Sequence, residues 1–183
     1  MSGIASPLLG VGTRRGPSHA AGLVNLLENV AIPHIKSLGE SSGSAVAKYM
    51  RGARISLQDA LGAAEAQGQP ISGKFEVDEG HLQLSVYTAK DGKFSEVLVD
   101  QNTGKVAKSE ALTDGNDLAA AERQMEAYGK SKTSLKTAVS QAEKAYPGYR
   151  AVSVTPTVSK GHPVAVVSLL QGNQTRSIAE PLE

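Results

Sequence analysis

A ten-residue segment of this 183-residue chain occurs twice, and this repetition limits the folds open to it. Residues 56–65 read Ser-Leu-Gln-Asp-Ala-Leu-Gly-Ala-Ala-Glu, and residues 134–143 read Ser-Leu-Lys-Thr-Ala-Val-Ser-Gln-Ala-Glu. The first Ser and Leu, two Ala and the final Glu recur at the same spacing, which chance rarely produces. The chain is therefore predicted to contain two related units.

The first copy of the repeat has the signals of a short amphipathic helix. Ser56 can accept a hydrogen bond from a free N–H of the first turn, and Asp59 places a carboxylate at the positive end of the helix dipole. The apolar positions share one face of this helix: Leu57, Ala60, Leu61 and Ala64. The second copy predicts a second helix of the same kind.

Alternating apolar and polar residues after each helix predict half-buried strands. In the first unit the predicted strands cover 74–78, 81–89 and 94–100, with hairpin turns at Glu79-Gly80 and Asp91-Gly92. A further turn over 100–106 leads into a last short strand. In the second unit the predicted strands cover 149–155, 163–170 and 175–179, and this unit stops where the first continues.

These elements predict an α+β fold of two helix-then-antiparallel-sheet units joined by a helical linker. The first unit covers 54–112, the linker 113–131 and the second unit 132–183. Residues 1–53 are predicted to form a flexible arm. Within that arm we expect an irregular Gly/Pro/Ser-rich start, a short helix from residue 19 to 33, a linker at 40–44 and a brief helical turn at 45–51.

Composition narrows the class of protein. Hydrophobic residues make up 40% of the chain but aromatic residues only 4%, which favours thin layers packed with Ala, Val and Leu over a deep pocket. There is no Cys, so disulfides and thiolate metal sites are excluded. No run approaches the roughly 18 consecutive apolar residues that a membrane span needs. Residues 55–112 hold five Lys/Arg against nine Asp/Glu, which disfavours nucleic acid as a partner.

The sequence favours a protein that is not an enzyme. Nothing in the spacing of Ser, His and Asp places them within mutual reach. Gly10-Val11-Gly12 lacks the Lys-Ser/Thr that would complete a phosphate-binding loop, and no predicted strand precedes it. No metal or organic cofactor is therefore required by a recognised catalytic pattern.

The sequence allows two alternative kinds of binding site. A hard cation such as calcium or a lanthanide needs several converging carboxylate oxygens, and adjacent hairpins of the acidic first unit supply candidates. The predicted ligands are Glu76, Asp78, Glu79, Asp91 and Asp100. Alternatively, a thin sheet covered by one helix leaves a strand edge to which an extended peptide can add, unless the two units cover each other.

The first unit resembles the PepSY domain family. The features that carry the resemblance are the order helix, strand, strand, strand, and the aliphatic strand 94–99 that enters an Asp-x-x-Thr-Gly turn at Asp100 to Gly104. The resemblance spans residues 54–112, and more weakly 132–180, where the second unit lacks that turn. It implies a tandem PepSY-like protein whose second unit is truncated.

The resemblance also implies a class of function and a location. PepSY domains occur in peptidase propeptides and in secreted or membrane-associated bacterial proteins, and the family is thought to bind or inhibit proteins at the cell envelope. Related tandem forms bind metal ions through surface carboxylates. We therefore expect a binding or inhibitory module for a protein or peptide partner, periplasmic or secreted, with cation binding as the alternative. Arg14-Arg15 resembles a twin-arginine export signal, but Asn25 and Glu28 interrupt the apolar stretch that such a signal needs.

Overall fold

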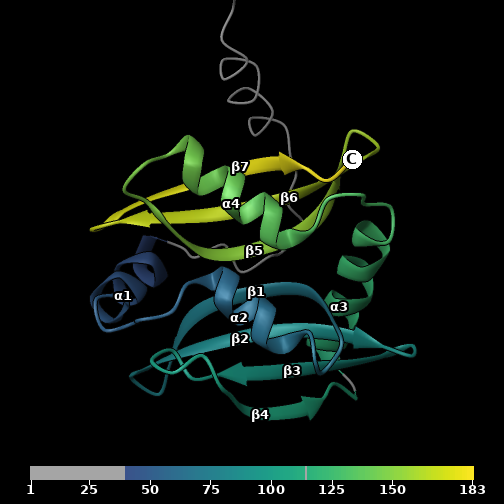
Figure 1. The fold of residues 1–183 in the computed structure, drawn as a ribbon, viewed down its shortest axis with the longest axis horizontal. Helices are drawn as coiled ribbons and strands as arrows, with labels where there is room; N and C mark the ends of the chain where they lie inside the picture. Colours follow the sequence, from purple (N-terminus) through teal and green to yellow (C-terminus); the bar gives the residue numbers. More distant parts are fainter. Residues whose placement is uncertain (1–39, 114) are drawn as a thin grey trace, which may run out of the picture.

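A computed structural model of the chain describes residues 40–113 and 115–183. The predictions for residues 1–39, including the helix at 19–33 and the Arg14-Arg15 pair, lie outside the described residues. The described part is an α+β structure in which four helices pack on one seven-stranded antiparallel sheet (Figure 1).

The elements follow one another in the predicted order. The helices are α1 (Glu40–Met50), α2 (Leu57–Ala64), α3 (Gly115–Tyr128) and α4 (Leu135–Ala145). The strands are β1 (Gln69–Asp78), β2 (His81–Lys90), β3 (Lys93–Val99), β4 (Val106–Ala111), β5 (Arg150–Ser159), β6 (His162–Gln171) and β7 (Gln174–Pro181). In the sheet their order is β4-β3-β2-β1-β5-β6-β7.

Local capping explains why both repeats are helical. The Ser56 hydroxyl accepts a hydrogen bond of 3.1 Å from the Asp59 N–H, and the Asp59 carboxylate accepts one of 2.8 Å from the Ser56 N–H. At α4 the Ser134 hydroxyl accepts a hydrogen bond of 3.1 Å from the Thr137 N–H. The apolar face predicted for α2 is buried, which confirms the helical spacing: Leu57, Ala60, Leu61 and Ala64.

Most strands are longer than the sequence predicted. β1 begins at Gln69, five residues before the predicted start, because Pro70 is tolerated at the beginning of a strand where its missing N–H is not needed. The pairing of β1 with β2 shifts register between Pro70 and Ser72. The pairing of β5 with β6 shifts between Ala151 and Ser153, at the corresponding place in the second hairpin.

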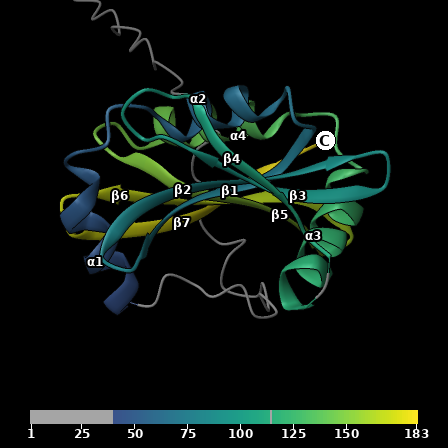
Figure 2. The ribbon, with the colours of Figure 1, turned by 90° about the horizontal axis from the view of Figure 1, so that it is seen from below.

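The two halves of the molecule join edge to edge. β1 and β5 pair antiparallel, with Gly73 opposite Val154 and Lys74 opposite Ser153. Helices α2 and α4 lie side by side on one face of the combined sheet (Figure 2). A Cβ atom on Gly73 would lie 3.3 Å from Leu57, so glycine lets α2 pack closely at the seam. This arrangement uses the inner edge of each half and leaves β4 and β7 as the outer strands.

Residues 40–53 differ from the predicted arm. The predicted linker at 40–44 belongs to α1, and the brief turn at 45–51 is its continuation. Val46 and Met50 of this helix, with Ala53 after it, are buried, because their apolar side chains pack against the rest of the core. The helix predicted between the units is α3, which lies at the opposite end of the sheet from α1 (Figure 1). The Ser72 hydroxyl of β1 donates to the Gln124 side chain of α3 at 2.7 Å.

A single apolar core connects both halves. Phe75 is its largest fully buried side chain, and the remainder is mostly Leu, Val and Ala from the sheet, α2 and α4. Among the described residues, no helix is long and apolar enough to cross a membrane.

Candidate functional site

The outer strand β4 is positioned by the turn that precedes it. The Asp100 carboxylate accepts hydrogen bonds from the Thr103 N–H at 2.7 Å, the Thr103 hydroxyl at 2.9 Å and the Asn102 N–H at 3.0 Å. The Gly104 N–H donates to the Asp100 carbonyl oxygen at 2.8 Å, and Gly104 has a φ of 71°, which glycine adopts without strain. The Asp-x-x-Thr-Gly sequence therefore folds as a self-contained reversal of the chain.

These hydrogen bonds set the charge state of the turn. They stabilise the ionised carboxylate, and the pKa of Asp100 is lowered by the Thr103 N–H first, then by the Thr103 hydroxyl and the Asn102 N–H. The turn is also attached to the segment before α2, because the N–H groups of Arg54 and Ile55 both donate to the Gln101 carbonyl oxygen. These hydrogen bonds therefore hold the residues from which strand β4 begins.

Strand β4 has one bonded edge and one outer edge. The Leu112 N–H donates to the Phe94 carbonyl oxygen at 2.9 Å, and Glu110 lies opposite Glu96 in the same register. In an antiparallel pair, the main-chain groups of alternate residues point to opposite edges. Leu112, Glu110 and Lys108 therefore direct their main-chain N–H and C=O groups toward β3. Ser109 and Ala111 direct these groups outward, whereas Ala107 lies at a register shift between β3 and β4, where the alternation breaks.

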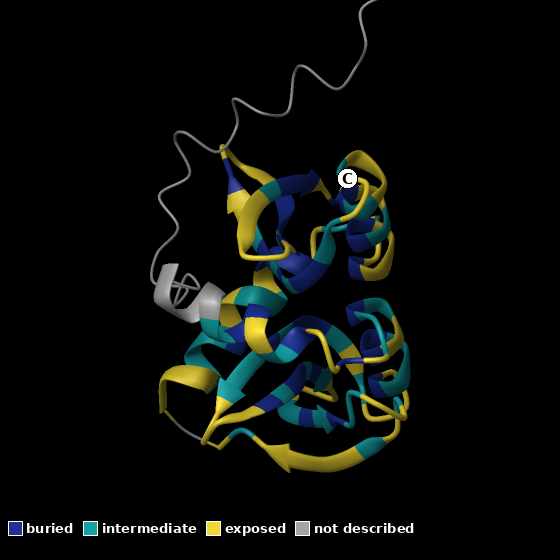
Figure 3. Cartoon of the chain, turned by 90° about the vertical axis from the view of Figure 1, so that its left-hand side faces the viewer, coloured by how far each residue is buried: buried dark blue, intermediate teal, exposed yellow. Residues whose placement is uncertain are grey.

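The outer edge of β4 is accessible within the part of the chain that the structure describes. β4 is the last strand of the sheet on its side, and five of its six residues are exposed. Figure 3 shows it as an exposed strand along the lower border of the molecule. Ser109 and Ala111 lie opposite Val97 and Ser95 on one face of the strand, and their small side chains leave its main chain uncovered. The edge can therefore accept another extended chain.

The predicted cation ligands occupy four separate places. Glu76 on β1 forms an ion pair of 2.7 Å with Lys74 and accepts a hydrogen bond from Ser85. Asp78 and Glu79 lie at the β1–β2 turn, and Asp91 lies at the β2–β3 turn, at the other end of the ten-residue β2. Asp100 caps its own turn. Over residues 40–113 and 115–183, no three His, Asp or Glu side chains gather as a group that can hold a metal ion. Cation binding by these residues stays a prediction.

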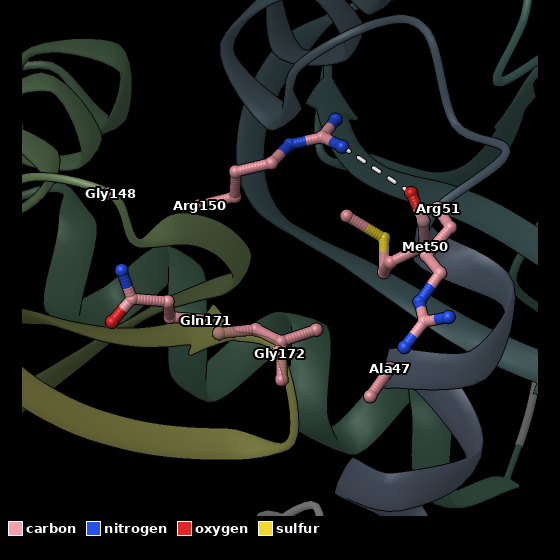
Figure 4. A pocket seen from close by; sticks show the side chains of 8 residues that line it. Ala47, Met50, Arg51, Gly148, Arg150, Gln171 and Gly172 are labelled. Carbon is pink, nitrogen blue, oxygen red and sulfur yellow. Dashed lines mark hydrogen bonds between the residues drawn. The ribbon is translucent and has the colours of Figure 1, made fainter.

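The described residues also enclose a small pocket of about 170 Å³ between the end of α1 and the β6–β7 turn (Figure 4). Arg150 at its border donates to the carbonyl oxygens of Ile55, Ala53 and Met50, at 3.0, 3.3 and 3.4 Å. These contacts connect α1 and the segment after it to β5. The arginine therefore helps to hold the two halves together. Both polar and apolar residues line the pocket, as is usual for a gap between packed elements.

One feature passed over in the sequence is a Gly-x-Ser-x-Gly spacing at residues 39–43. A nucleophilic serine in this motif requires the sharp turn between a strand and a helix. Ser41 instead lies within the helical residues of α1, which begins at Glu40. Ser41 therefore does not have the backbone position of a nucleophile in such an elbow.

The sequence analysis also did not single out strand β4. The short strand after the Asp-x-x-Thr-Gly turn was expected, but its position at the outer edge depends on the pairing of β1 with β5, which has no local signal. Residues 106–112 do carry a local sign of an exposed strand. Lys108 and Glu110, which have opposite charges, are separated by Ser109 and flanked by two alanines.

Comparison with known family models gives one match, to part of the chain. The family model described as "Peptidase propeptide and YPEB domain" (PepSY) matches residues 54–110, from the segment before α2 through most of β4. No curated protein and no solved structure matched the chain. The matched stretch contains the Asp-x-x-Thr-Gly turn on which the resemblance rests, and most of β4. This chain therefore contains a PepSY domain, at residues 54–110.

Proposed function

We propose that this chain is a non-enzymatic binding module of the propeptide or inhibitor type, which holds an extended segment of a protein partner along β4. The family match supports a propeptide-like or protease-regulating role. The observation that carries the proposal is the outer edge of β4, where Ser109 and Ala111 present unpaired main-chain groups among the described residues.

The edge has the properties that strand addition requires. Main-chain hydrogen bonds to the edge supply affinity, and the side chains that alternate along it supply selectivity. The turn at Asp100 and the pairing with β3 hold the edge in place before a partner arrives. Binding therefore loses little conformational entropy on the side of this protein.

Residues 132–180 are, in this proposal, a second PepSY-like unit with one strand fewer among the described residues. Three features support it. The order α4, β5, β6, β7 repeats α2, β1, β2, β3. The first two strands have the same lengths in both halves, and the register shift follows Pro70 in one hairpin and Ala151 in the other. Among the described strands, β7 is the outermost on its side of the sheet.

The proposed setting is the bacterial cell envelope or the exterior, where peptidases that carry PepSY propeptides act. In this setting, the partner is a peptidase or another exported protein. The module acts by occupying an extended-chain binding site or by covering it, without chemistry of its own.

Inhibition of purified extracellular peptidases tests the proposal. The full chain is added to a panel of serine, cysteine, aspartic and metallopeptidases, and hydrolysis of a fluorogenic peptide is followed. We expect saturable inhibition of at least one peptidase by the wild-type chain. The variant Ser109→Pro removes an outward N–H while leaving the bonds to β3 in place, so we expect it to inhibit at least tenfold more weakly.

Two variants serve as matched controls. Ser109→Ala keeps the main-chain N–H and should inhibit like the wild type. Ser177→Pro makes the same change on the opposite edge, because the Leu182 N–H donates inward to Pro163 and the odd-numbered residues of β7 point outward. It should leave inhibition at β4 intact. No inhibition of any peptidase, or equal inhibition by Ser109→Pro and the wild type, would contradict the proposal.

A further inference from the structure

Strand β4 and the residue after it form a self-complementary sequence. Residues 106–112 read Val-Ala-Lys-Ser-Glu-Ala-Leu. Counted outward from Ser109, the residue types match on the two sides: opposite charges first, then Ala with Ala, then Val with Leu. A sequence of this kind can pair with a second copy of itself when the two strands run antiparallel, because each residue then meets its complement.

The main chain permits this pairing. If a two-fold axis passes through Ser109, this outward-pointing residue lies opposite Ser109 of the second copy, and the pair exchanges both main-chain hydrogen bonds. Ala107 lies at the register shift between β3 and β4, so the pairing is centred on Ser109 and is short. The side chains on this face of the strand are small and exposed, so they allow the close approach.

The charges select this register. Lys108 lies opposite Glu110 of the second copy, and Glu110 lies opposite Lys108 of the second copy, on the face that also carries Leu112. Val106 lies opposite Val99 and is on the other face, with Ser109. Both charged side chains are more than half exposed, and they already lie 2.7 Å apart along the strand. Moving the two-fold axis to Lys108 or to Glu110 places like charges directly opposite each other, which is destabilising.

We infer that β4 pairs with β4 of a second copy of this chain, so that the two sheets form one continuous sheet across a two-fold axis. The inference rests on the proposed function, because it concerns the same edge and assigns a means of regulation to it. A partner segment must displace the second copy before it binds. A pairing of two short strands buries little surface, so the dimer is reversible and depends on protein concentration.

Sedimentation velocity of the full chain over a range of concentrations tests this inference. We expect the wild type to shift from monomer to dimer as concentration rises. Lys108→Glu and Glu110→Lys each create two like-charge pairs across the axis, so each variant alone should dimerise about tenfold more weakly. An equimolar mixture of the two variants restores two opposite-charge pairs and should associate again. The double variant Lys108→Glu/Glu110→Lys should dimerise like the wild type.

The same variants separate this inference from the proposed function. Circular dichroism should show unchanged secondary structure, because both side chains are exposed. A wild type that stays monomeric at every concentration, or single variants that dimerise as strongly as the wild type, would overturn the inference. If peptidase inhibition persists in those cases, the proposed function stands. If the dimer forms but no peptidase is inhibited, the dimer stands and the proposed function fails.

Discussion

Arg150, the first residue of β5, donates a hydrogen bond of 3.0 Å from its guanidinium group to the main-chain carbonyl oxygen of Ile55, just before α2. Two longer bonds reach the carbonyl oxygens of Met50 and Ala53. One partly buried side chain thus connects the PepSY domain and α1 to the second half of the sheet.

Replacing this arginine should weaken the whole fold. We expect Arg150→Ala to lower the free energy of unfolding by about 1–3 kcal/mol, because three carbonyl oxygens lose a charged donor. Arg150→Lys should restore only part of the loss, since an ammonium group does not reproduce the planar fork. Urea unfolding measures both, with the exposed Arg123→Ala as the control. Equal losses in the free energy of unfolding for Arg150→Ala and Arg123→Ala would show that the three hydrogen bonds of Arg150 do not stabilise the fold.

The turn before β4 should show a characteristic pH dependence. The pKa of Asp100 is lowered in the folded state, chiefly by the Thr103 N–H, so its stabilisation is complete above the unfolded-state pKa of about 3.9 and is lost as pH falls through the folded-state value. Asp100→Ala should therefore lower the thermal midpoint at pH 7, and the difference from wild type should shrink below pH 4. Asp78→Ala, at an exposed strand end, is the control. A difference that stays constant with pH would contradict this explanation.

The close packing of α2 on β1 depends on the absence of a side chain at Gly73. A Cβ atom there would already lie 3.3 Å from Leu57 and 3.4 Å from Leu61. We expect Gly73→Val to destabilise the protein by about 1–3 kcal/mol, because the larger side chain forces α2 away from the sheet. Gly62→Ala, within α2, should instead be neutral or stabilising by up to about 1 kcal/mol. Chemical denaturation of the two variants distinguishes steric crowding from a general effect of losing glycine.

A buried carboxylate on β7 should reduce stability at neutral pH. Glu180 is only 8% exposed, and burial raises its pKa above the ordinary value. Because the folded state disfavours the charged form, this cost is absent below the unfolded-state pKa and appears as pH rises through and above it. Glu180→Gln should raise the thermal midpoint by a few degrees at pH 7 and leave it unchanged at pH 3. A rise of the same size at both pH values would point to packing rather than charge.

The cation-binding alternative has its own test. A hard cation that binds only the folded state raises stability by about 2.7 kcal/mol at a hundredfold excess over its dissociation constant. This alternative predicts a saturable rise of the thermal midpoint with calcium or lanthanum over that in chelator, with magnesium and zinc for comparison. The rise should be lost when the predicted ligands are replaced by amides: Glu76, Asp78, Glu79, Asp91 and Asp100. An unchanged midpoint with every ion would rule it out.

Local features of the fold followed from the sequence alone. The Ser56 cap, the apolar face of α2 and the Asp-x-x-Thr-Gly turn each depend on contacts between residues a few positions apart. The alternation of apolar residues located the strands, although not their ends, because pairing with a neighbour extends a strand beyond its apolar part. The family resemblance rested on these same local features, which is why residues 54–110 were recognised.

The arrangement of these elements depended on tertiary structure. Gly73 and Val154 are far apart in the sequence, and no local pattern indicates that β1 and β5 pair. The same holds for α1, whose residues 40–44 resemble a linker by composition but are helical. Because the pairing of the two inner strands decides which strands remain outermost, the site at β4 became visible only in the folded molecule. The sequence determined the local units and the charges on β4, and long-range packing decided which edge those charges occupy.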